Sequence, residues 1–417
     1  MIDQTRKDPA GHLFVLHWQL TEFGGVNSVV KGLYHAMEGH AKQRPHVLLA
    51  LWQAETVQSC PGYELSALRI RAPFGKRPLK MLAAFLLTLP KTLLQLRRLI
   101  KAHHIETINP HLPGLECFTF RIARRLLGIK LVISLHGSEL IDVMMPSKGV
   151  ERWWFKRLLG GGDYLVVPSH SLGRRLRTFV PPLQSRIRVV WNATEPDVFR
   201  RLASESAVEL PPKPYLILVG GFELIEEGFS PPHYRKGQDI ALQAWHEIRI
   251  RHPEARLLIV GTGGPTADWI RERVRVTPGA IMMEHQPDAA VSRLISGAAM
   301  LILPSRGNES FGIALIEAGS HAVPVISTTV DGIPEVVRDG VDGFLIPPND
   351  PAALARAVTK LLSDPALAIR MGKNFQERVQ TEFIWRRALA QYEDLKNAPR
   401  LEDAPPSIPL ALESDQS

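Results

Sequence analysis

Short apolar runs alternate with helix-like patterns of apolar and polar residues along both halves of the chain. This alternation is typical of parallel sheets whose faces are covered by helices. In the first half the apolar runs predict strands at Leu13–Trp18, His46–Trp52, Ser66–Ile70, Glu106–Asn109, Leu131–Leu135, Tyr164–Pro168 and Ile187–Trp191. In the second half they predict strands at Tyr215–Gly220, Ala255–Gly261, Ile281–Glu284, Met300–Pro304, Val325–Thr328 and Gly343–Ile346. The pattern therefore predicts an α/β chain of two doubly wound, Rossmann-like domains.

Polar and proline-bearing stretches predict where these domains begin and end. We expect a first domain at residues 1–199, a linker at 200–214 and a second domain at 215–384. The tail at residues 398–417 carries prolines and acidic residues and is expected to be disordered. Doubly wound domains bind ligands at the carboxyl ends of their strands, so a cleft between the two domains is the expected site.

Composition and charge narrow the class of protein. The 417 residues are 45% hydrophobic and 22% charged, as in ordinary soluble proteins. With only Cys60 and Cys117, neither a disulfide framework nor a structural zinc site is expected, and a reducing compartment fits. The start lacks an apolar signal core, and no run of about 18 uninterrupted apolar residues occurs, so we predict a cytoplasmic protein without a bilayer-spanning segment. The net charge of +8 suits anionic partners, whereas no aromatic-basic module indicates nucleic acid.

The segment Ala72–His104 combines an apolar run, Met81–Leu89, with several basic residues, and Pro90 should kink or divide it. The basic residues are Lys76, Arg77, Lys80, Lys91, Arg97, Arg98 and Lys101. One interpretation is an amphipathic helix pair that contacts an anionic membrane surface. The other is a domain helix whose basic face is solvated.

Two glutamates frame the most informative local pattern. Glu309 lies where a polar loop after an apolar run turns into a helix, and Glu317 lies about 12 Å further along that helix. The two acids are only about 80° apart around the helix, so they can serve opposite ends of one elongated ligand. The backbone N–H groups of Phe311, Gly312 and Ile313 point at an anion between them. This layout suits a sugar joined through a diphosphate to a nucleoside.

The residues around the two glutamates carry a family resemblance. With Gly307, Ala318, Pro324–Ser327 and Gly332–Gly340, the segment resembles the Glu-any-seven-Glu signature of retaining glycosyltransferases of family 4, which have the GT-B fold. The spacing alone would equally fit an ordinary strand-loop-helix unit with two solvated acids. The running match of the neighbouring residues favours the family.

The resemblance implies an enzyme that moves a hexose-type sugar from a UDP- or GDP-sugar to a glycan or lipid-linked acceptor, with retention and without a metal or other cofactor. By resemblance, Glu309 accepts hydrogen bonds from donor-sugar hydroxyls and Glu317 binds the ribose hydroxyls. Retention in the family is ascribed to front-face attack, in which the departing phosphate oxygen takes the acceptor's proton. The family also has a final helix, here residues 385–397, that returns to the N-terminal domain.

Two sites in the first half match the family. Gly24 and Gly25 open a helix after the first strand, where backbone amides can approach a phosphate. A tight strand-helix turn without a ligand would have the same glycines. His136 follows Leu131–Leu135, where the family has a histidine that contacts the donor sugar near the reacting carbon. A neutral imidazole could orient a sugar hydroxyl, and the protonated form would oppose an oxocarbenium-like centre.

The basic element after Tyr215–Gly220 departs from the family pattern. Lys236 falls on the expected lysine, but Gly221 replaces the expected arginine and a longer loop follows. Arg235 either takes over the second cationic role or faces solvent. Loss of one such contact in a closed site costs on the order of 10²-fold in rate.

The remaining candidates are weaker. Gly261 lies in a glycine-rich turn typical of nucleotide sites, and His285 follows a strand where the family holds the base. Asn192 either shapes the cleft or caps a turn. No Asp-any-Asp triplet supports a metal-bridged diphosphate, and His103, His104 and His111 lack the spacing of a zinc site.

The sequence therefore predicts a cytoplasmic glycosyltransferase, peripheral at the inner face of the plasma membrane if the basic segment binds lipid, in assembly of a bacterial surface polysaccharide or glycolipid. Two alternatives stay open. The missing arginine at Gly221 fits a catalytically inactive GT-B scaffold that acts as a binding or partner subunit. A sugar-nucleotide epimerase on a similar fold would release products without consuming an acceptor.

Overall fold

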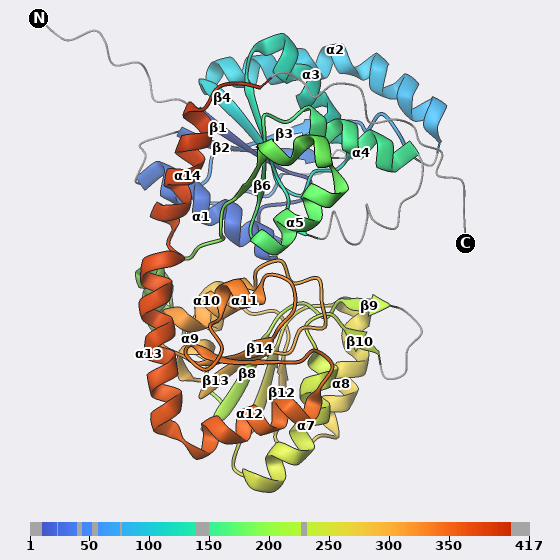
Figure 1. Cartoon of the computed structure of the whole chain (residues 1–417). Coiled ribbons are helices and arrows are strands. Elements are labelled where there is room, and N and C mark those ends of the chain that lie inside the picture. The colour runs from blue at the N-terminus through green and yellow to red at the C-terminus, as the bar shows by residue number, and fades with distance from the viewer. Residues whose placement is uncertain are drawn as a thin grey trace, which may run out of the picture. The chain divides into compact units, whose positions relative to one another are not determined.

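The computed structural model describes residues 11–22, 24–39, 44–51, 57–75, 77–137, 150–226 and 232–401. The chain divides into two compact units. Unit 1 comprises Met1–Val190 and Ala388–Ser417, and unit 2 comprises Trp191–Arg387 (Figure 1). Each unit is built around its own parallel sheet.

Unit 1 contains a seven-stranded sheet in the order β3-β2-β1-β4-β5-β6-β7. The strands are β1 (Gly11–Leu16), β2 (Arg44–Leu51), β3 (Leu65–Arg69), β4 (Ile105–Pro110), β5 (Lys130–Ser134), β6 (Tyr164–Val167) and β7 (Ile187–Val189). Its helices are α1 (Gly25–Gly39), α2 (Pro78–Ala102), α3 (Phe118–Leu127), α4 (Val150–Gly160), α5 (His170–Phe179) and most of α14 (Trp385–Asn397). Strand β1 is central and fully buried, with Leu13 opposite His46 of β2 and Ile108 of β4.

Unit 2 contains a six-stranded sheet in the order β12-β11-β8-β13-β14-β15. The strands are β8 (Tyr215–Val219), β11 (Arg256–Val260), β12 (Ala280–Met283), β13 (Met300–Leu303), β14 (Val325–Thr328) and β15 (Gly343–Ile346). The helices are α6 (Pro196–Glu205), α7 (Gln238–Arg251), α8 (Asp268–Arg275), α9 (Asp288–Gly297), α10 (Ile313–Ser320), α11 (Ile333–Val336), α12 (Pro351–Ser363) and α13 (Pro365–Glu382).

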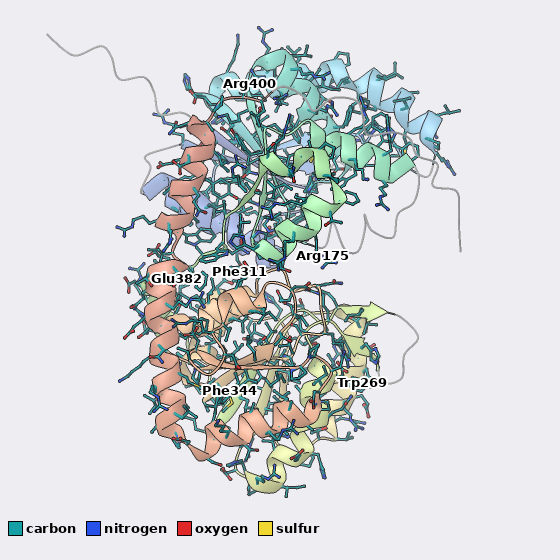
Figure 2. All side chains as sticks on the ribbon, in the orientation of Figure 1. Arg175, Trp269, Phe311, Phe344, Glu382 and Arg400 are labelled. Carbon is teal, nitrogen blue, oxygen red and sulfur yellow. The ribbon has the colours of Figure 1, made fainter. Side chains whose placement is uncertain are left out.

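Alternation along the strands of unit 2 divides its core into two layers. Leu216 and Leu218 of β8 join one hydrophobic cluster, whereas Tyr215 and Ile217 join the other. Successive strand residues point to opposite faces, so a strand covered on both sides is apolar throughout. Trp269 and Phe344 pack against the first layer and Phe311 lies in the second (Figure 2).

The structure confirms the predicted fold class, because two doubly wound parallel-sheet units are present and every predicted strand has its counterpart. One element was missed. The loop after β8 carries a short antiparallel hairpin of β9 (Leu224–Glu226) and β10 (His233–Tyr234).

The domain boundaries differ from the sequence-based expectation. Unit 1 ends at Val190 instead of residue 199, and the first part of the expected linker belongs to α6 of unit 2. Pro196 at the start of α6 favours a helix there, because proline fits the first turn. Of the tail that we expected to be disordered, residues 402–417 lie outside the described residues.

Helix α14 occupies the position expected for the final helix and, from Ala388, belongs to unit 1. Lys130 Nζ donates a 2.9 Å hydrogen bond to the carbonyl of Leu395 near the end of this helix. The hydroxyl groups of Tyr392 and Ser134 lie 3.2 Å apart. Cations suit the C-terminal end of a helix, where carbonyls lack intrahelical partners.

We expected Pro90 to kink or divide this segment; α2 continues through Pro90, so the proline does not divide it. Thr88 Oγ1 donates to the carbonyl of Ala84 at 2.8 Å, and Thr92 Oγ1 donates to the carbonyl of Thr88 at 3.1 Å. Such side-chain bonds supply donors near a proline that has no N–H. Lys76, predicted in this basic segment, lies outside the described residues.

By length and composition α2 could cross a membrane, with a mean hydropathy of 1.4 over its most apolar window. From the sequence we expected no helix that could span a bilayer, because no uninterrupted apolar run is long enough. Helix α2 nevertheless has the length and composition of a membrane span, although charged residues interrupt its apolar run. A core helix of a soluble protein passes the same test, and Phe85 and Leu96 do pack inward. Of the residues of α2, however, only Phe85, Thr92 and Leu96 are buried.

Candidate active site

The segment between β13 and α10 forms the centre of the candidate site in unit 2. Ser305, directly after β13, is buried, and its carbonyl accepts a 2.8 Å hydrogen bond from Thr328 Oγ1. Gly312 adopts a φ of 88° immediately before α10, a left-handed conformation that favours glycine. The turn at Gly312 therefore starts α10 at the carboxyl end of the sheet, where its first amides lack helical partners.

Glu309 is fixed within this loop through its backbone. Its N–H donates to Asp331 Oδ2 at 3.1 Å, and its carbonyl accepts from the Gly332 N–H at 3.1 Å. Both partners follow β14, the neighbouring strand. The side chain of Glu309 is nearly buried, so its carboxylate holds one position in the absence of ligand.

Two cations surround the Glu309 carboxylate. Its Oε2 forms an ion pair with Lys236 Nζ and lies 3.9 Å from an Arg235 guanidinium nitrogen. Burial would raise the pKa of Glu309, but Lys236, Arg235 and a hydrogen bond from the Gly312 N–H hold it below the ordinary value. Glu309 is therefore ionised at neutral pH, and Lys236 and Arg235 place two cations beside this carboxylate.

The position of Lys236 depends on the residue that follows it. Gly237 has a φ of 74° and begins α7, and a Cβ at this position would lie 2.0 Å from the carbonyl oxygen of Pro304. No side chain fits there, so the backbone of Gly237 lies directly against the end of β13. This close approach brings Lys236 beside the loop that carries Glu309.

Arg235 is directed toward the same loop and is only partly exposed. Its Nε donates to Glu223 Oε2 at 2.7 Å, and one terminal nitrogen donates to the carbonyl of Asn308 at 3.1 Å. The backbone carbonyl of Arg235 accepts a 3.0 Å bond from the Arg306 N–H. Of the two interpretations from sequence, this placement favours a role beside Lys236, with the guanidinium paired to Glu223.

Glu317 differs from Glu309 in its charge state. It lies on α10, and burial together with the nearby negative charge of Asp288 raises the pKa of Glu317 to about 7. Near neutral pH its carboxyl group is therefore divided between the neutral and ionised forms. The protonated form can donate as well as accept a hydrogen bond, which suits contact with vicinal hydroxyls.

In unit 1, His136 follows β5 and belongs to a buried polar chain. Its Nε2 lies 3.0 Å from His111 Nδ1, and His111 Nε2 lies 3.1 Å from Asn109 Oδ1. The amide nitrogen of Asn109 donates to the carbonyl of Val132 at 2.8 Å and to Ser134 Oγ at 2.9 Å. Burial lowers the pKa of His136 to about 4, so this ring is neutral at physiological pH.

Gly24 and Gly25 lie at the start of α1, with Gly24 at a φ of 153°. The loop before them is organised by Asn27, which is buried. Its amide nitrogen donates to the carbonyl of Glu22 at 2.7 Å, and its Oδ1 accepts a 2.9 Å bond from Trp18 Nε1. Asn27 thus helps to position the backbone of this loop. From the sequence, only the two glycines had been predicted to have a role there.

Comparison with known proteins identifies the family of this chain. Residues 23–198 match the family described as Glycosyltransferase Family 4, and residues 228–364 match Glycosyl transferases group 1. The chain belongs to glycosyltransferase family 4. The family resemblance inferred from the sequence is confirmed.

The names of curated relatives of this glycosyltransferase indicate different acceptors. An N-acetyl-alpha-D-glucosaminyl L-malate synthase of Bacillus anthracis is 27% identical over 301 residues, which is 70% of this chain and 73% of that protein. A phosphatidyl-myo-inositol mannosyltransferase of Mycobacterium leprae is 28% identical over 358 residues, which is 83% of this chain and 86% of that protein. Enzymatic glycosyl transfer is common to both.

Solved structures show the same GT-B fold. Sucrose-phosphate synthase from Thermosynechococcus elongatus has a TM-score of 0.70 at 22% identity, covering 93% of this chain and 98% of that chain. HepE of Anabaena, in complex with UDP and glucose, has a TM-score of 0.68 at 16% identity and covers 93% of this chain and 99% of that chain.

Three further predicted donor-site residues of the glycosyltransferase lie at strand ends of unit 2. The Gly221 carbonyl accepts a 3.0 Å bond from Gln238 Nε2. A Cβ on Gly261 would lie 2.0 Å from the Gly220 carbonyl oxygen, so only glycine allows these turns to pack so closely. His285 follows β12 and is exposed. These placements locate the residues but do not test their predicted contacts.

The side chain of Phe311 serves the core. Phe311 is buried and packs edge-on against Phe383, with ring centroids 5.6 Å apart. Only its backbone can therefore contact a ligand. Ile313, at the start of α10, is partly exposed.

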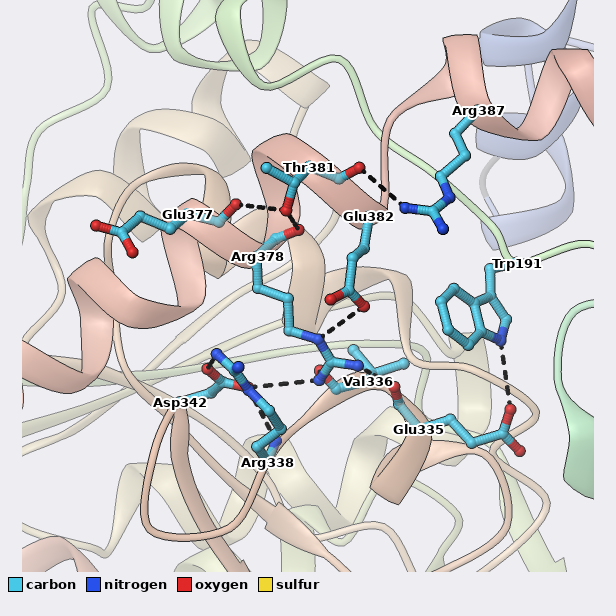
Figure 3. A network of polar contacts seen from close by, with 10 residues as sticks. All are labelled: Trp191, Glu335, Val336, Arg338, Asp342, Glu377, Arg378, Thr381, Glu382 and Arg387. Atoms are coloured by element: carbon cyan, nitrogen blue, oxygen red, sulfur yellow. Dashed lines mark hydrogen bonds and ion pairs between the residues drawn. The ribbon is translucent and has the colours of Figure 1, made fainter.

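A polar network supports the segment after α11 (Figure 3). Arg378 of α13 donates to the carbonyls of Glu335 and Val336, both at 2.9 Å, and lies 3.4 Å from Asp342. Trp191 Nε1 donates to Glu335 Oε2 at 3.4 Å. Asn192, the adjacent predicted residue, is buried.

Sequence reasoning missed Asp331, Glu223, Asn27, Asn109 and His111. Asp331 follows β14, and a polar residue directly after a buried parallel strand is a signal that could have indicated it. The roles of Glu223, Asn27, Asn109 and His111 can be recognised only from the side chains and backbone groups that they contact in the folded structure. Ser138 and Glu139, beside His136, lie outside the described residues.

Two groups of side chains within the described ranges could hold a metal ion, and both belong to unit 1. One comprises His17, Glu116 and Cys117, and the other comprises His46, Glu64 and His103. Neither group includes Glu309 or Glu317.

Proposed function

We propose that this glycosyltransferase moves a hexose-type sugar from a UDP- or GDP-sugar to a glycan or lipid-linked acceptor with retention of anomeric configuration and without a metal. The observation that supports this proposal is the cluster of Lys236, Arg235 and Glu309 beside the first turn of α10. Lys236, Arg235 and the amides at the start of α10 suit a diphosphate. The buried carboxylate suits the hydroxyls of a sugar.

The proposed roles follow from the charge of each group. Lys236 and Arg235 neutralise charge that develops on the leaving diphosphate, and this stabilisation is largest where water is excluded. Glu309, ionised, accepts hydrogen bonds from the donor sugar, and Glu317 binds the ribose. We assign to neutral His136 the orientation of a sugar hydroxyl near the reacting carbon. The diphosphate oxygen takes the acceptor's proton as the new bond forms, so no separate general base is required.

We further propose a lipid-linked acceptor and peripheral contact with the anionic inner face of the plasma membrane, in assembly of a surface polysaccharide or glycolipid. Helix α2 exposes Leu79, Leu87 and Leu94 and carries basic residues such as Lys91. Apolar side chains next to cations suit an interface between acyl chains and anionic headgroups. The mannosyltransferase relatives, whose names specify phosphatidylinositol acceptors, support a lipid acceptor.

The test is turnover with a panel of UDP- and GDP-hexoses and membrane lipid extract from a bacterium. We expect release of nucleotide diphosphate with one donor, an anomeric proton coupling in the product that matches the donor, and undiminished rate in excess chelator. Inverted configuration would contradict retention. Loss of activity in chelator that Mg²⁺ or Mn²⁺ restores and Zn²⁺ does not would contradict metal-independent transfer.

An inactive scaffold is the alternative favoured by Gly221, which stands where the family has arginine. Such a protein would bind a donor in calorimetry without releasing nucleotide diphosphate from any member of the panel. A sugar-nucleotide epimerase would instead convert the donor when no acceptor is present.

A further inference from the structure

Three separate segments of unit 1 bring two histidines and a glutamate together. His46 lies on β2, Glu64 directly before β3, and His103 directly after α2. The Nδ1 atoms of His46 and His103 lie 3.5 and 3.4 Å from the same oxygen, Oε2 of Glu64. The two rings face each other with centroids 4.1 Å apart. One ligand atom from each residue thus falls within 4.8 Å of the other two.

We propose that His46, Glu64 and His103 bind a Zn²⁺ ion, and we term this group the zinc staple. Imidazole nitrogen and carboxylate oxygen are preferred zinc ligands, with bonds of about 2.0–2.1 Å in tetrahedral geometry. Such bonds place neighbouring ligand atoms about 3.3 Å apart, close to the two separations found here. A water molecule completes the fourth position.

The hydrogen bonding of His46 supports a metal at this point. Its Nε2 lies 2.9 Å from Ser66 Oγ. In one tautomer Nδ1–H donates to Glu64 and Nε2 accepts from the Ser66 hydroxyl. In the other, Nε2–H donates to Ser66 and the lone pair of Nδ1 points toward the Glu64 carboxylate, where a cation can be bound between them. A partner on the second ring nitrogen is also the usual support of a metal-bound histidine.

The backbone holds the three ligands in place without a metal. The Glu64 N–H donates to the Tyr34 hydroxyl at 2.9 Å, and the Glu64 carbonyl accepts from the Val47 N–H at 2.9 Å. The His103 N–H donates to the Leu99 carbonyl at 3.1 Å, which ends α2 at this residue. Because its ligands are preformed, the zinc staple requires little rearrangement to bind an ion.

The second histidine cluster of unit 1 is less suited to a metal. His17 Nδ1 lies 3.0 Å from Glu116, and His17 Nε2 lies 3.5 Å from Cys117 Sγ. One ligand atom from each of these residues also falls within 4.8 Å of the other two, but His17 contacts its two partners through different ring nitrogens. In the zinc staple, by contrast, two rings converge on one oxygen.

Zinc at this position would tie the end of α2 to β2 and β3. It is independent of the proposed glycosyl transfer, because none of its residues is assigned to the donor or acceptor. The expected role is to stabilise unit 1 and fix the C-terminal end of the exposed helix.

The test is a zinc titration of metal-stripped, full-length protein without a polyhistidine tag. We expect one Zn²⁺ per chain by calorimetry and a higher Tm with zinc present. Glu64→Gln and His103→Ala should each weaken zinc binding more than tenfold, and Ser66→Ala by about 10-fold to 100-fold. Glu64 is 64% exposed and His103 is 33% exposed, so both variants should fold, as their unchanged Tm without metal would show.

Cys117→Ser is the matched control, because it alters the other cluster and should leave zinc affinity unchanged. Co²⁺ provides a second readout, since a tetrahedral site of nitrogen and oxygen ligands gives visible absorption without a thiolate-to-cobalt band. The proposal is overturned if the wild-type protein binds no stoichiometric zinc or if Glu64→Gln and His103→Ala bind as tightly as wild type. A thiolate band that disappears in Cys117→Ser would also overturn it, by placing the metal at His17, Glu116 and Cys117.

Discussion

The Nε2 atom of His136 lies 3.0 Å from the Nδ1 atom of His111, and this contact fixes how His136 presents its ring. Asn109 uses its amide N–H groups on Val132 and Ser134, so its oxygen accepts the Nε2–H of His111. His111 Nδ1 is then an acceptor, and His136 must donate its Nε2–H to it. The other ring nitrogen of His136, Nδ1, is consequently an acceptor.

His111→Phe should therefore reduce kcat on the order of 10-fold to 10²-fold, because His136 loses the partner that sets its tautomer and orientation. Nitrogen-15 NMR of the histidine rings should show an Nε2–H tautomer for His136 in wild type that is lost in the variant. Thr107→Val is the control, since Thr107 lies on the same strand as Asn109 and its buried hydroxyl has no hydrogen-bond partner within the described residues. Equal losses in both variants would assign the effect to packing.

Lys236→Met should depress kcat by on the order of 10²–10³-fold, with a smaller effect on donor affinity, if Lys236 stabilises charge that develops in the transition state. Steady-state kinetics and calorimetry with the intact donor separate the two quantities. Lys373, a lysine of α13 on the same unit, is the control position for removal of one charge. A Lys236→Met variant that loses affinity and turnover equally would place this contact in ground-state binding.

Arg235→Ala should lower turnover on the order of 10²-fold, because Arg235 supplies the second cation in place of the arginine absent at Gly221. Introduction of Gly221→Arg into this variant should restore most of the loss. A Cβ at Gly221 would meet only the end of the flexible Glu223 side chain, at 3.0 Å, so a side chain can be accommodated.

The measurement is kcat for the wild type, Arg235→Ala and the double variant with the same donor. Arg249→Ala, at the last turn of α7, controls for general loss of positive charge. If Arg235→Ala turned over as fast as wild type, Arg235 would have only a structural role in its pair with Glu223.

The raised pKa of Glu317 predicts the pH dependence of stability. The folded-state value of about 7 exceeds the ordinary value of 4.5, so the folded protein holds this proton more tightly than the unfolded chain. The free energy of unfolding should then fall as pH rises from about 4.5 to 7, because the buried group must ionise. Glu317→Gln removes this cost and should stabilise the protein at pH 8 by on the order of 1–3 kcal/mol.

Urea unfolding of both proteins at pH 5 and pH 8 tests this sign. The advantage of Glu317→Gln should be large at pH 8 and small at pH 5. Glu247→Gln, on the exposed surface of α7, should show no such difference. A gain that does not depend on pH would mean that Glu317 keeps its ordinary pKa.

Helix α2 should bind anionic vesicles through its exposed leucines and basic residues. Leu87→Glu should abolish co-flotation with phosphatidylglycerol liposomes, because it places a charge where an apolar side chain, 82% exposed, would enter the interface. Ile250→Glu is the matched control in unit 2, at a residue that is 71% exposed. Binding should weaken at high salt, since the basic residues are screened. If wild-type protein did not co-float with these liposomes even at low salt, α2 would be an ordinary solvated helix and the prediction would be wrong.

Periodicity predicted the regular elements well because the signal is local. The strands were found within a few residues, since a strand buried on both faces must be apolar along its length. The β9-β10 hairpin was missed because its strands have only three and two residues, too few to show an alternating pattern. The boundary at Val190 was also missed, because the strand of unit 1 is followed almost directly by a helix of unit 2.

The sequence by itself determined the two α/β units and the family, and it predicted Glu309, Glu317 and Lys236 as site residues, because each of these depends on neighbours within one strand-loop-helix segment. Tertiary structure alone decided which polar side chains meet: Arg235 with Glu223, Glu309 with Lys236, and His136 with His111. It also brought His46, Glu64 and His103 together from three segments, where spacing along the chain had indicated no zinc site. The physical reason is that the chain order of residues constrains local backbone geometry, whereas charge and hydrogen-bond partners are selected by whichever side chains the packed sheet places within a few ångströms.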